Sequence, residues 1–155
     1  MSMEHKFSVV ELKAQPGLAI KETVAFGEIP AKMAEFLGEL GRFIGERHIA
    51  VIGPPFAYYH SWNDKETGME VGFPVGPGAA GEGRIRMMSL PGGRVVSGTH
   101  IGPYDKLAES YNAMTAWMKS HGHAPANHMW ETYLTDPHAE KDPAKYKTQM
   151  FWPVT

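Results

Sequence analysis

The sequence predicts an α+β fold built from two similar halves. Together the halves contribute eight antiparallel strands, and two helices cover one face of the sheet. We expect a central cleft on the uncovered face, where the halves meet. Three observations support this fold class. Eight short segments have strand composition, two longer segments carry apolar residues at helical spacing, and the same order of elements occurs twice. We expect residues 1–155 to form one domain, because a chain of this length can bury a sizeable core.

The first half begins with two predicted strands, at residues 7–12 and 18–26, separated by a turn at Gln15-Pro16-Gly17. A helix is expected from Pro30 to about residues 45–48, since proline suits the first helical turn, where its missing N–H would have no partner. The apolar stripe of this helix comprises Met33, Phe36, Leu37, Leu40, Phe43 and Ile44. After an extended loop, residues 56–62 and 69–75 are predicted to pair as a hairpin.

The second half follows a flexible segment of small residues at 76–83. Strands are predicted at 84–90 and 94–100, then a helix that begins near Tyr104 and ends near Gly122, then strands at 128–134 and 146–154. The stripe of this helix comprises Leu107, Tyr111, Met114, Trp117 and Met118. Each half thus reads as hairpin, helix, hairpin, which predicts pseudo-repeats at about 6–75 and 84–155.

Composition excludes several kinds of function. Cysteine is absent, so thiol catalysis, thiolate metal sites and disulfides are excluded. Fifteen Lys and Arg against seventeen Asp and Glu, without a basic cluster, predict no direct nucleic-acid contact. The first 13 residues contain no apolar run long enough for a signal peptide or a membrane span, so we expect an unprocessed cytoplasmic protein without a membrane partner.

Glu131 is the most informative residue of the predicted strand at 128–134. Side chains alternate along a strand, so Glu131 shares one face with Met129 and Tyr133, while Trp130 and Thr132 lie on the other. Two interpretations follow. The carboxylate is either solvated at a sheet surface or held in an aromatic-lined cavity, where burial raises its pKa and favours a proton or an organic cation.

Other side chains allow a structural and a functional reading. Ten Met, seven Phe, six Tyr and four Trp suit a pocket for apolar cations, but they are also ordinary core residues. His121 and His123 lie near a helix end without a third ligand at diagnostic spacing, so we predict no metal site and no cofactor.

Two segments resemble a known family. Glu131-Thr132-Tyr133-Leu134-Thr135-Asp136-Pro137, together with the closing segment at 148–154, resembles the E-x-Y-L-x-D-P … P-[IV] ending of GyrI-like domains, also called AraC-type or BmrR-type effector-binding domains. The segment at 53–59 and the helix start at Gly102-Pro103-Tyr104 match other landmarks of that family. The resemblance therefore covers nearly the whole chain.

This resemblance implies duplicated βαββ units of the SHS2 type and a pocket between the halves for bulky hydrophobic or cationic aromatic molecules. It implies that Glu131 faces this pocket among aromatic rings. The candidate ligand-binding residues are Glu131, Tyr133, Tyr59, Tyr58, Tyr104, Trp130, Trp152 and Phe56. A related fold, the SOUL type, binds haem, which keeps haem as a remote alternative.

Several of these candidates have a structural alternative. Adjacent Tyr58 and Tyr59 must face opposite ways in a strand, and the correspondence of Tyr59 with Tyr133 favours Tyr59 as the pocket residue. Trp130 and Trp152 also suit core packing, and Tyr104 either reaches the cleft or packs at the helix start. The first-half equivalent of Glu131 is Ala57, so the expected site has one acidic group.

Three functions remain as hypotheses. The first is a stand-alone binder of hydrophobic cations that senses or sequesters them. The second, as in some similar stand-alone proteins, is a hydrolase of cyclopropane-containing alkylating compounds with Glu131 as general base or acid. The third is a gyrase-inhibitor-like interaction protein. A regulatory role would need a separate DNA-binding partner, because we expect no room for a DNA-binding domain in this chain. Whether the protein forms a homodimer is left open.

Overall fold

The computed structural model describes residues 6–154 and confirms the α+β class, with eight antiparallel strands and two helices. The strands are β1 (Ser8–Leu12), β2 (Gln15–Ala25), β3 (Phe56–Trp62), β4 (Glu66–Pro74), β5 (Ile85–Leu90), β6 (Gly93–Ile101), β7 (Met129–Tyr133) and β8 (Lys147–Pro153). The helices are α1 (Ile29–Glu46) and α2 (Leu107–Ser120), and three short 3₁₀ turns are η1 (Phe26–Glu28), η2 (Tyr104–Lys106) and η3 (Pro143–Lys145).

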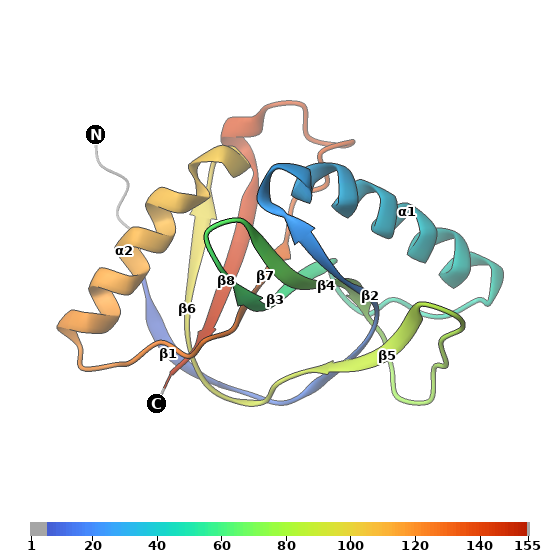
Figure 1. Cartoon of the computed structure of the whole chain (residues 1–155), viewed down its shortest axis with the longest axis horizontal. Helices are drawn as coiled ribbons and strands as arrows, with labels where there is room; N and C mark the ends of the chain where they lie inside the picture. Colours follow the sequence, from blue (N-terminus) through green and yellow to red (C-terminus); the bar gives the residue numbers. More distant parts are fainter. Residues whose placement is uncertain (1–5, 155) are drawn as a thin grey trace. The chain divides into compact units, whose positions relative to one another are not determined.

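The chain forms two compact units (Figure 1). The central unit is Lys13–Gly92, and the terminal unit combines the chain up to Leu12 with the chain from Gly93 onward. In the central unit the strands are paired in the order β3-β4-β2-β5, and in the terminal unit in the order β1-β6-β8-β7.

Two of the four predicted hairpins are present. β3 pairs with β4, and β7 pairs with β8. The hairpins predicted at the start of each half are wrong: β1 pairs with β6 from Ser8↔Ser97 to Leu12↔Gly93, and β5 pairs with β2. The first strand of each sequence repeat therefore pairs with the second strand of the other repeat. As a result, the compact units do not coincide with the sequence repeats.

The Pro-Gly signal that predicted the first turn has a different cause. Gln15, Pro16 and Gly17 are the first residues of β2 rather than a reversal. A Cβ built on Gly17 would lie 2.9 Å from Cζ of Phe56, so this position has no room for a side chain. The glycine therefore marks a close approach inside the sheet.

In the terminal unit, α2 packs on one face of β6 and β8, as the helical stripe predicts. Buried Val96, Met114, Met118 and Met150 form the core, and partly buried Phe7, Leu107, Tyr111, Trp117, Trp152 and Val154 pack around it. Phe7 lies over Gly98, where a Cβ would come within 2.5 Å of its ring, and it also packs on Trp117 with ring centroids 6.2 Å apart. Gly98 is thus required for the position of Phe7.

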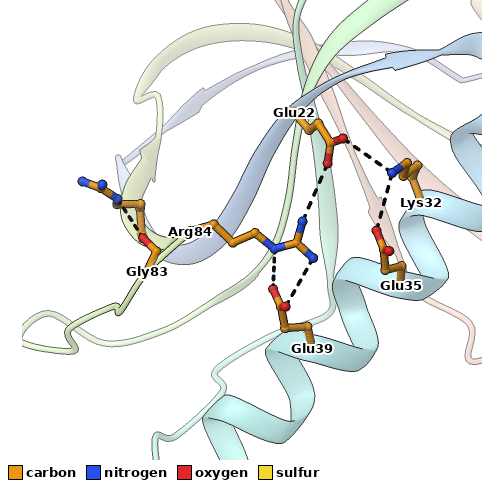
Figure 2. A network of polar contacts seen from close by, with 7 residues as sticks. Glu22, Lys32, Glu35, Glu39, Gly83 and Arg84 are labelled. Atoms are coloured by element: carbon orange, nitrogen blue, oxygen red, sulfur yellow. Dashed lines mark hydrogen bonds and ion pairs between the residues drawn. The ribbon is translucent and has the colours of Figure 1, made fainter.

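In the central unit, α1 buries Phe36, Leu40 and Ile44. Lys32 on α1 forms an ion pair with Glu22 on β2, which shows that the side of β2 carrying Glu22 faces α1 (Figure 2). Over residues 6–154, neither helix combines the length and apolar character that crossing a bilayer requires.

Candidate functional site

Glu131 is a buried carboxylate in β7, with only 4% of its surface exposed. The hydroxyl of Tyr111 donates to its Oε1 over 2.8 Å, and the hydroxyl of Tyr133 donates to its Oε2 over 3.0 Å. Burial raises the pKa of Glu131, and the two hydrogen bonds oppose that rise without cancelling it. Both donors are neutral phenols, so they stabilise the charged carboxylate without neutralising it.

The strand register shows which face of the terminal unit carries this carboxylate. Glu131 is opposite Met150 and Tyr133 is opposite Thr148, and directly opposed residues share a face. Met150 belongs to the core beneath α2. Glu131 therefore faces α2, so the expectation that its side chain points to the uncovered face of the strands is wrong. The contact with Tyr111, a helix residue, gives the same orientation.

Further aromatic side chains extend from Glu131 toward the surface of the terminal unit. Tyr104 makes an edge contact with Tyr133 at 5.9 Å between ring centroids and a tilted contact with Tyr146 at 5.3 Å. Tyr104 is 38% exposed. Its pKa is raised by burial first, then by Tyr146, Glu131 and Asp136, so the charge of Glu131 acts on it electrostatically.

Trp152 joins the same group through Tyr111. The two rings meet edge to face at 5.9 Å, and the indole Nε1 of Trp152 donates to the carbonyl of Ala126 over 2.8 Å. The indole is thereby fixed against the phenol that holds Glu131. We call this group the Glu131 cluster; its members are Glu131, Tyr104, Tyr111, Tyr133, Tyr146 and Trp152.

Sequence reasoning missed two members of the cluster. Tyr111 was assigned to the apolar stripe of the second helix, and Tyr146 only to the closing strand. A signal for Tyr111 does exist, because a partly buried tyrosine in a stripe of Met and Leu requires a partner for its hydroxyl.

Trp130 lies on the opposite face of β7 from Glu131. It stacks on Phe151 with ring centroids 5.5 Å apart and is 2% exposed. The structure thus buries Trp130 against Phe151, on the face of β7 away from the Glu131 cluster. A ligand contact of Trp130 stays a prediction.

The remaining candidates belong to the central unit. Phe56 is fully buried over Gly17 and Gly72, which makes it a core residue of that unit. Tyr59 is opposite Met69, on the face that carries Glu22 and α1, whereas Tyr58 is opposite Glu70 on the other face. The two tyrosines thus face opposite ways. That Tyr59 contributes to a ligand site with Glu131 stays a prediction.

Tyr58 has polar surroundings of its own. It is 6% exposed, and its ring centroid lies 4.4 Å from that of His60, whose Nε2 is 2.5 Å from Oε1 of Glu70. Burial, followed by the charge of Glu70, raises the pKa of Tyr58. Tyr58 is therefore part of a packed polar group in the central unit.

An open pocket of about 370 Å³ also lies in the central unit, between α1 and the segment that follows Gly81. It is lined by Glu39, Arg42, Phe43, Glu46, Glu82, Gly83, Arg84 and Ile85. Arg84 is already paired with Glu39 and Glu22 (Figure 2). Glu82 is likewise paired with Arg47. The buried carboxylate of the terminal unit, which has no ion-pair partner among the described residues, is the stronger candidate site.

The chemistry of the Glu131 cluster is that of a proton or cation site. Within residues 6–154, no three His, Asp or Glu side chains gather as a metal site would require. A carboxylate with a raised pKa can take up or release a proton, and it gains from a cation that replaces its lost hydration. Together, the fold and this cluster define an α+β domain suited to binding an organic molecule.

Comparison with known families agrees with that class. The family described as the GyrI-like small molecule binding domain matches residues 5–155. The chain therefore belongs to the GyrI-like small molecule binding domain family. No curated protein matches the sequence.

Solved structures show the same fold at low identity. The C-terminal domain of EcmrR is 21% identical, with 99% of each chain covered and a TM-score of 0.86. In a complex of EcmrR with DNA, the match has 20% identity and a TM-score of 0.84, covering 97% of this chain and 57% of that chain. This chain thus spans little more than half of the longer EcmrR chain.

Two other neighbours bear functional descriptions. SAV2435 bound to tetraphenylphosphonium is 12% identical, covering 99% of this chain and 94% of that one, with a TM-score of 0.64. A hydrolase from Listeria innocua is 15% identical, covering 97% and 92%, with a TM-score of 0.70.

Proposed function

We propose that this protein binds bulky, hydrophobic, cationic aromatic molecules through the Glu131 cluster and acts as a sensing or sequestering protein. The observation that carries the proposal is the burial of Glu131 between the hydroxyls of Tyr111 and Tyr133. A buried carboxylate has lost most of its hydration, and two neutral donors restore only part of it. An organic cation supplies the missing positive charge with little hydration of its own to lose.

The surrounding rings favour the same class of ligand. The face of a tyrosine ring attracts a cation, with a contribution of about 0.5–2 kcal/mol for a well-placed ring. Tyr133 donates to the carboxylate, Tyr104 packs against Tyr133, and Tyr104 is partly exposed at the surface of the terminal unit, so two such rings lie near the charge. The description of SAV2435, a protein of similar fold bound to tetraphenylphosphonium, supports a delocalised aryl cation as the probe.

The test is a titration with tetraphenylphosphonium followed by tryptophan fluorescence and calorimetry. Glu131→Gln keeps the size and one acceptor oxygen but removes the charge, so we expect at least a roughly tenfold weaker affinity. The matched control is Glu11→Gln, which removes an exposed carboxylate from β1 of the same unit. Equal affinities of the wild type and Glu131→Gln would refute the proposal.

A second candidate function uses the same carboxylate as a proton carrier. Burial raises the pKa of Glu131, which brings a carboxyl group closer to the range in which a general base or acid works at neutral pH. The substrate class is a strained, cyclopropane-containing alkylating compound. Glu131 would take a proton from water as the water oxygen bonds to one ring carbon. The strained carbon–carbon bond breaks, its electron pair passes to the departing carbon side of the substrate, and the proton from Glu131 is returned there.

The hydrolase candidate predicts turnover. We expect many equivalents of such an electrophile to be converted to the ring-opened alcohol, with no conversion by Glu131→Gln. Binding of one equivalent without product would contradict the hydrolase function while leaving the binding function intact.

A further inference from the structure

His100 is a buried histidine of β6 with both ring nitrogens engaged, and it is 3% exposed. Its Nδ1 lies 2.6 Å from Oγ of Ser110 on α2, and its Nε2 lies 2.9 Å from the carbonyl oxygen of Pro103. A carbonyl can only accept, so Nε2 carries a hydrogen. In the neutral ring, Nδ1 then accepts from the hydroxyl of Ser110. His100 thus joins its strand, α2 and the turn between them.

That turn carries Tyr104 of the Glu131 cluster. Gly102 has a φ of 136°, a conformation that favours glycine, and its N–H donates to the carbonyl of Tyr146 over 2.8 Å. The carbonyl of Pro103, which receives the His100 bond, also accepts from the N–H of Lys106 over 3.1 Å. The backbone on the N-terminal side of Tyr104 is therefore anchored at two successive residues.

The other sequence repeat provides an internal comparison. Glu22 and Lys32 are ten residues apart, and so are His100 and Ser110. The offset between the two repeats is also the same for both pairs, so Glu22 corresponds to His100 and Lys32 corresponds to Ser110. Nζ of Lys32 lies 3.5 Å from Oε1 of Glu22, which also ties a strand to a helix (Figure 2).

The Glu22–Lys32 ion pair and the His100–Ser110 hydrogen bond differ in whether the strand residue can also bond the following turn. A glutamate carboxylate only accepts, so it cannot bond a backbone carbonyl of the following turn as the Nε2–H of His100 does. Phe26 occupies the position that corresponds to Tyr104. The turn at Phe26 is tied instead by its own N–H, which donates to the carbonyl of Lys65 over 3.2 Å. Among the described residues, a side chain of the strand bonds the turn before a tyrosine in the repeat that contains Glu131.

We propose that His100 is a positioning residue for ligand binding: through the carbonyl of Pro103 it holds Tyr104 against Tyr133, beside Glu131. The proposal rests on the proposed binding function for its effect on affinity. His100 itself is buried beneath the turn and acts through Tyr104. Its role at the Pro103 carbonyl is separable from its bond to Ser110, because the two bonds use different nitrogens.

Three variants separate the two bonds. In His100→Gln the side-chain amide reaches as far as Nε2 and can still donate to Pro103. In His100→Asn the shorter amide reaches only as far as Nδ1, so the bond to Ser110 is kept and the bond to Pro103 is lost. Ser110→Ala removes the other bond and is the matched control.

The first readout needs no ligand. In the full-length protein, nuclear Overhauser contacts between the ring protons of Tyr104 and Tyr133 report their edge contact. We expect these contacts in the wild type, His100→Gln and Ser110→Ala, and their loss in His100→Asn. Retention of the ring contact in His100→Asn would overturn the positioning role.

The second readout is the affinity for tetraphenylphosphonium, measured with melting temperatures. We expect His100→Asn to weaken binding about five- to tenfold, and the other two variants to stay within about twofold of the wild type. In a Tyr104→Ala background, His100→Asn should have no further effect. Weakening by all three variants in proportion to lost thermal stability would reduce His100 to a structural role. Failure of the wild type to bind the cation would instead overturn the binding function, while the ring contact still decides the positioning of Tyr104.

Discussion

The hydroxyl of Tyr111 donates a 2.8 Å hydrogen bond to Oε1 of Glu131, joining α2 to β7 across 20 residues of sequence. This bond stabilises the ionised carboxylate in a place where burial opposes ionisation. The balance between these two effects sets the protonation state of Glu131 and the strength with which the cluster attracts a cation.

Removing a phenol hydroxyl should raise the pKa of Glu131 further. In Tyr111→Phe the ring remains but the donor is lost, so the charged form loses part of its stabilisation. The measurement is a carbon-13 NMR titration of the Glu131 carboxyl carbon, with Tyr133→Phe as a second variant that removes the other donor. An unchanged or lowered pKa in both variants would show that these hydrogen bonds do not stabilise the charge.

Glu131 should make stability fall as pH rises. The pKa of Glu131 in the folded protein lies above its ordinary value of 4.5, so between these two values the folded state binds more protons than the unfolded state. The associated stability is fully present below the ordinary value and is lost as pH rises through the raised one.

Urea denaturation of the wild type and Glu131→Gln at a series of pH values measures this loss. We expect the free energy of unfolding of Glu131→Gln to increase relative to that of the wild type as pH rises from 4.5 through the raised pKa of Glu131. The reason is that the amide forms no buried charge. A difference that stays constant with pH would contradict the shift.

Gly98→Ala should destabilise the terminal unit. The added Cβ would lie 2.5 Å from Cδ1 of Phe7, and moving that ring also disturbs its contact with Trp117. We expect a loss of about 1–3 kcal/mol in thermal or urea denaturation, typical of overpacking. Gly41→Ala in α1 is the control, since nothing lies within 4 Å of its added Cβ and a gain of about 0.5–1 kcal/mol is expected. Equal effects of the two changes would mean that Phe7 does not occupy this space.

Thr148→Val should leave the protein as stable or make it more stable. Oγ1 of Thr148 is buried and has no hydrogen-bond partner among the described residues. Replacing an unsatisfied buried hydroxyl with a methyl group removes a desolvation cost of about 1–3 kcal/mol. Thermal denaturation measures the change, and a clear loss of stability would show that the hydroxyl is paired in solution.

The positions of the elements could be predicted from periodicity, because alternation and helical spacing are local properties. The partners of the first strands could not. β1 and β5 are short strands that suit either pairing, and the choice is made by contacts distant in sequence, such as Phe7 over Gly98. The Pro16-Gly17 pair also misled the prediction. The sequence does not distinguish a glycine that makes room for a neighbouring side chain inside a sheet from a glycine in a turn.

In the candidate site, too, local relationships were predictable and contacts between distant elements were not. Glu131 and Tyr133 were predicted together because they alternate on one strand, and Tyr133 does donate to Glu131. Tyr111 was missed because its partner lies on another element, and a helical stripe does not show where a hydroxyl points. The face of the carboxylate was also mispredicted, since α2 covers the face of the strands that carries Glu131.

The central claim is that the charge of Glu131 recognises a cation. The most direct test compares the affinities for tetraphenylphosphonium and for neutral triphenylphosphine oxide in the wild type and in Glu131→Gln at neutral pH. We predict that the wild type prefers the cation by roughly tenfold or more and that Glu131→Gln loses this preference while its affinity for the neutral compound changes little. The same preference for the cation in both proteins would contradict the claim.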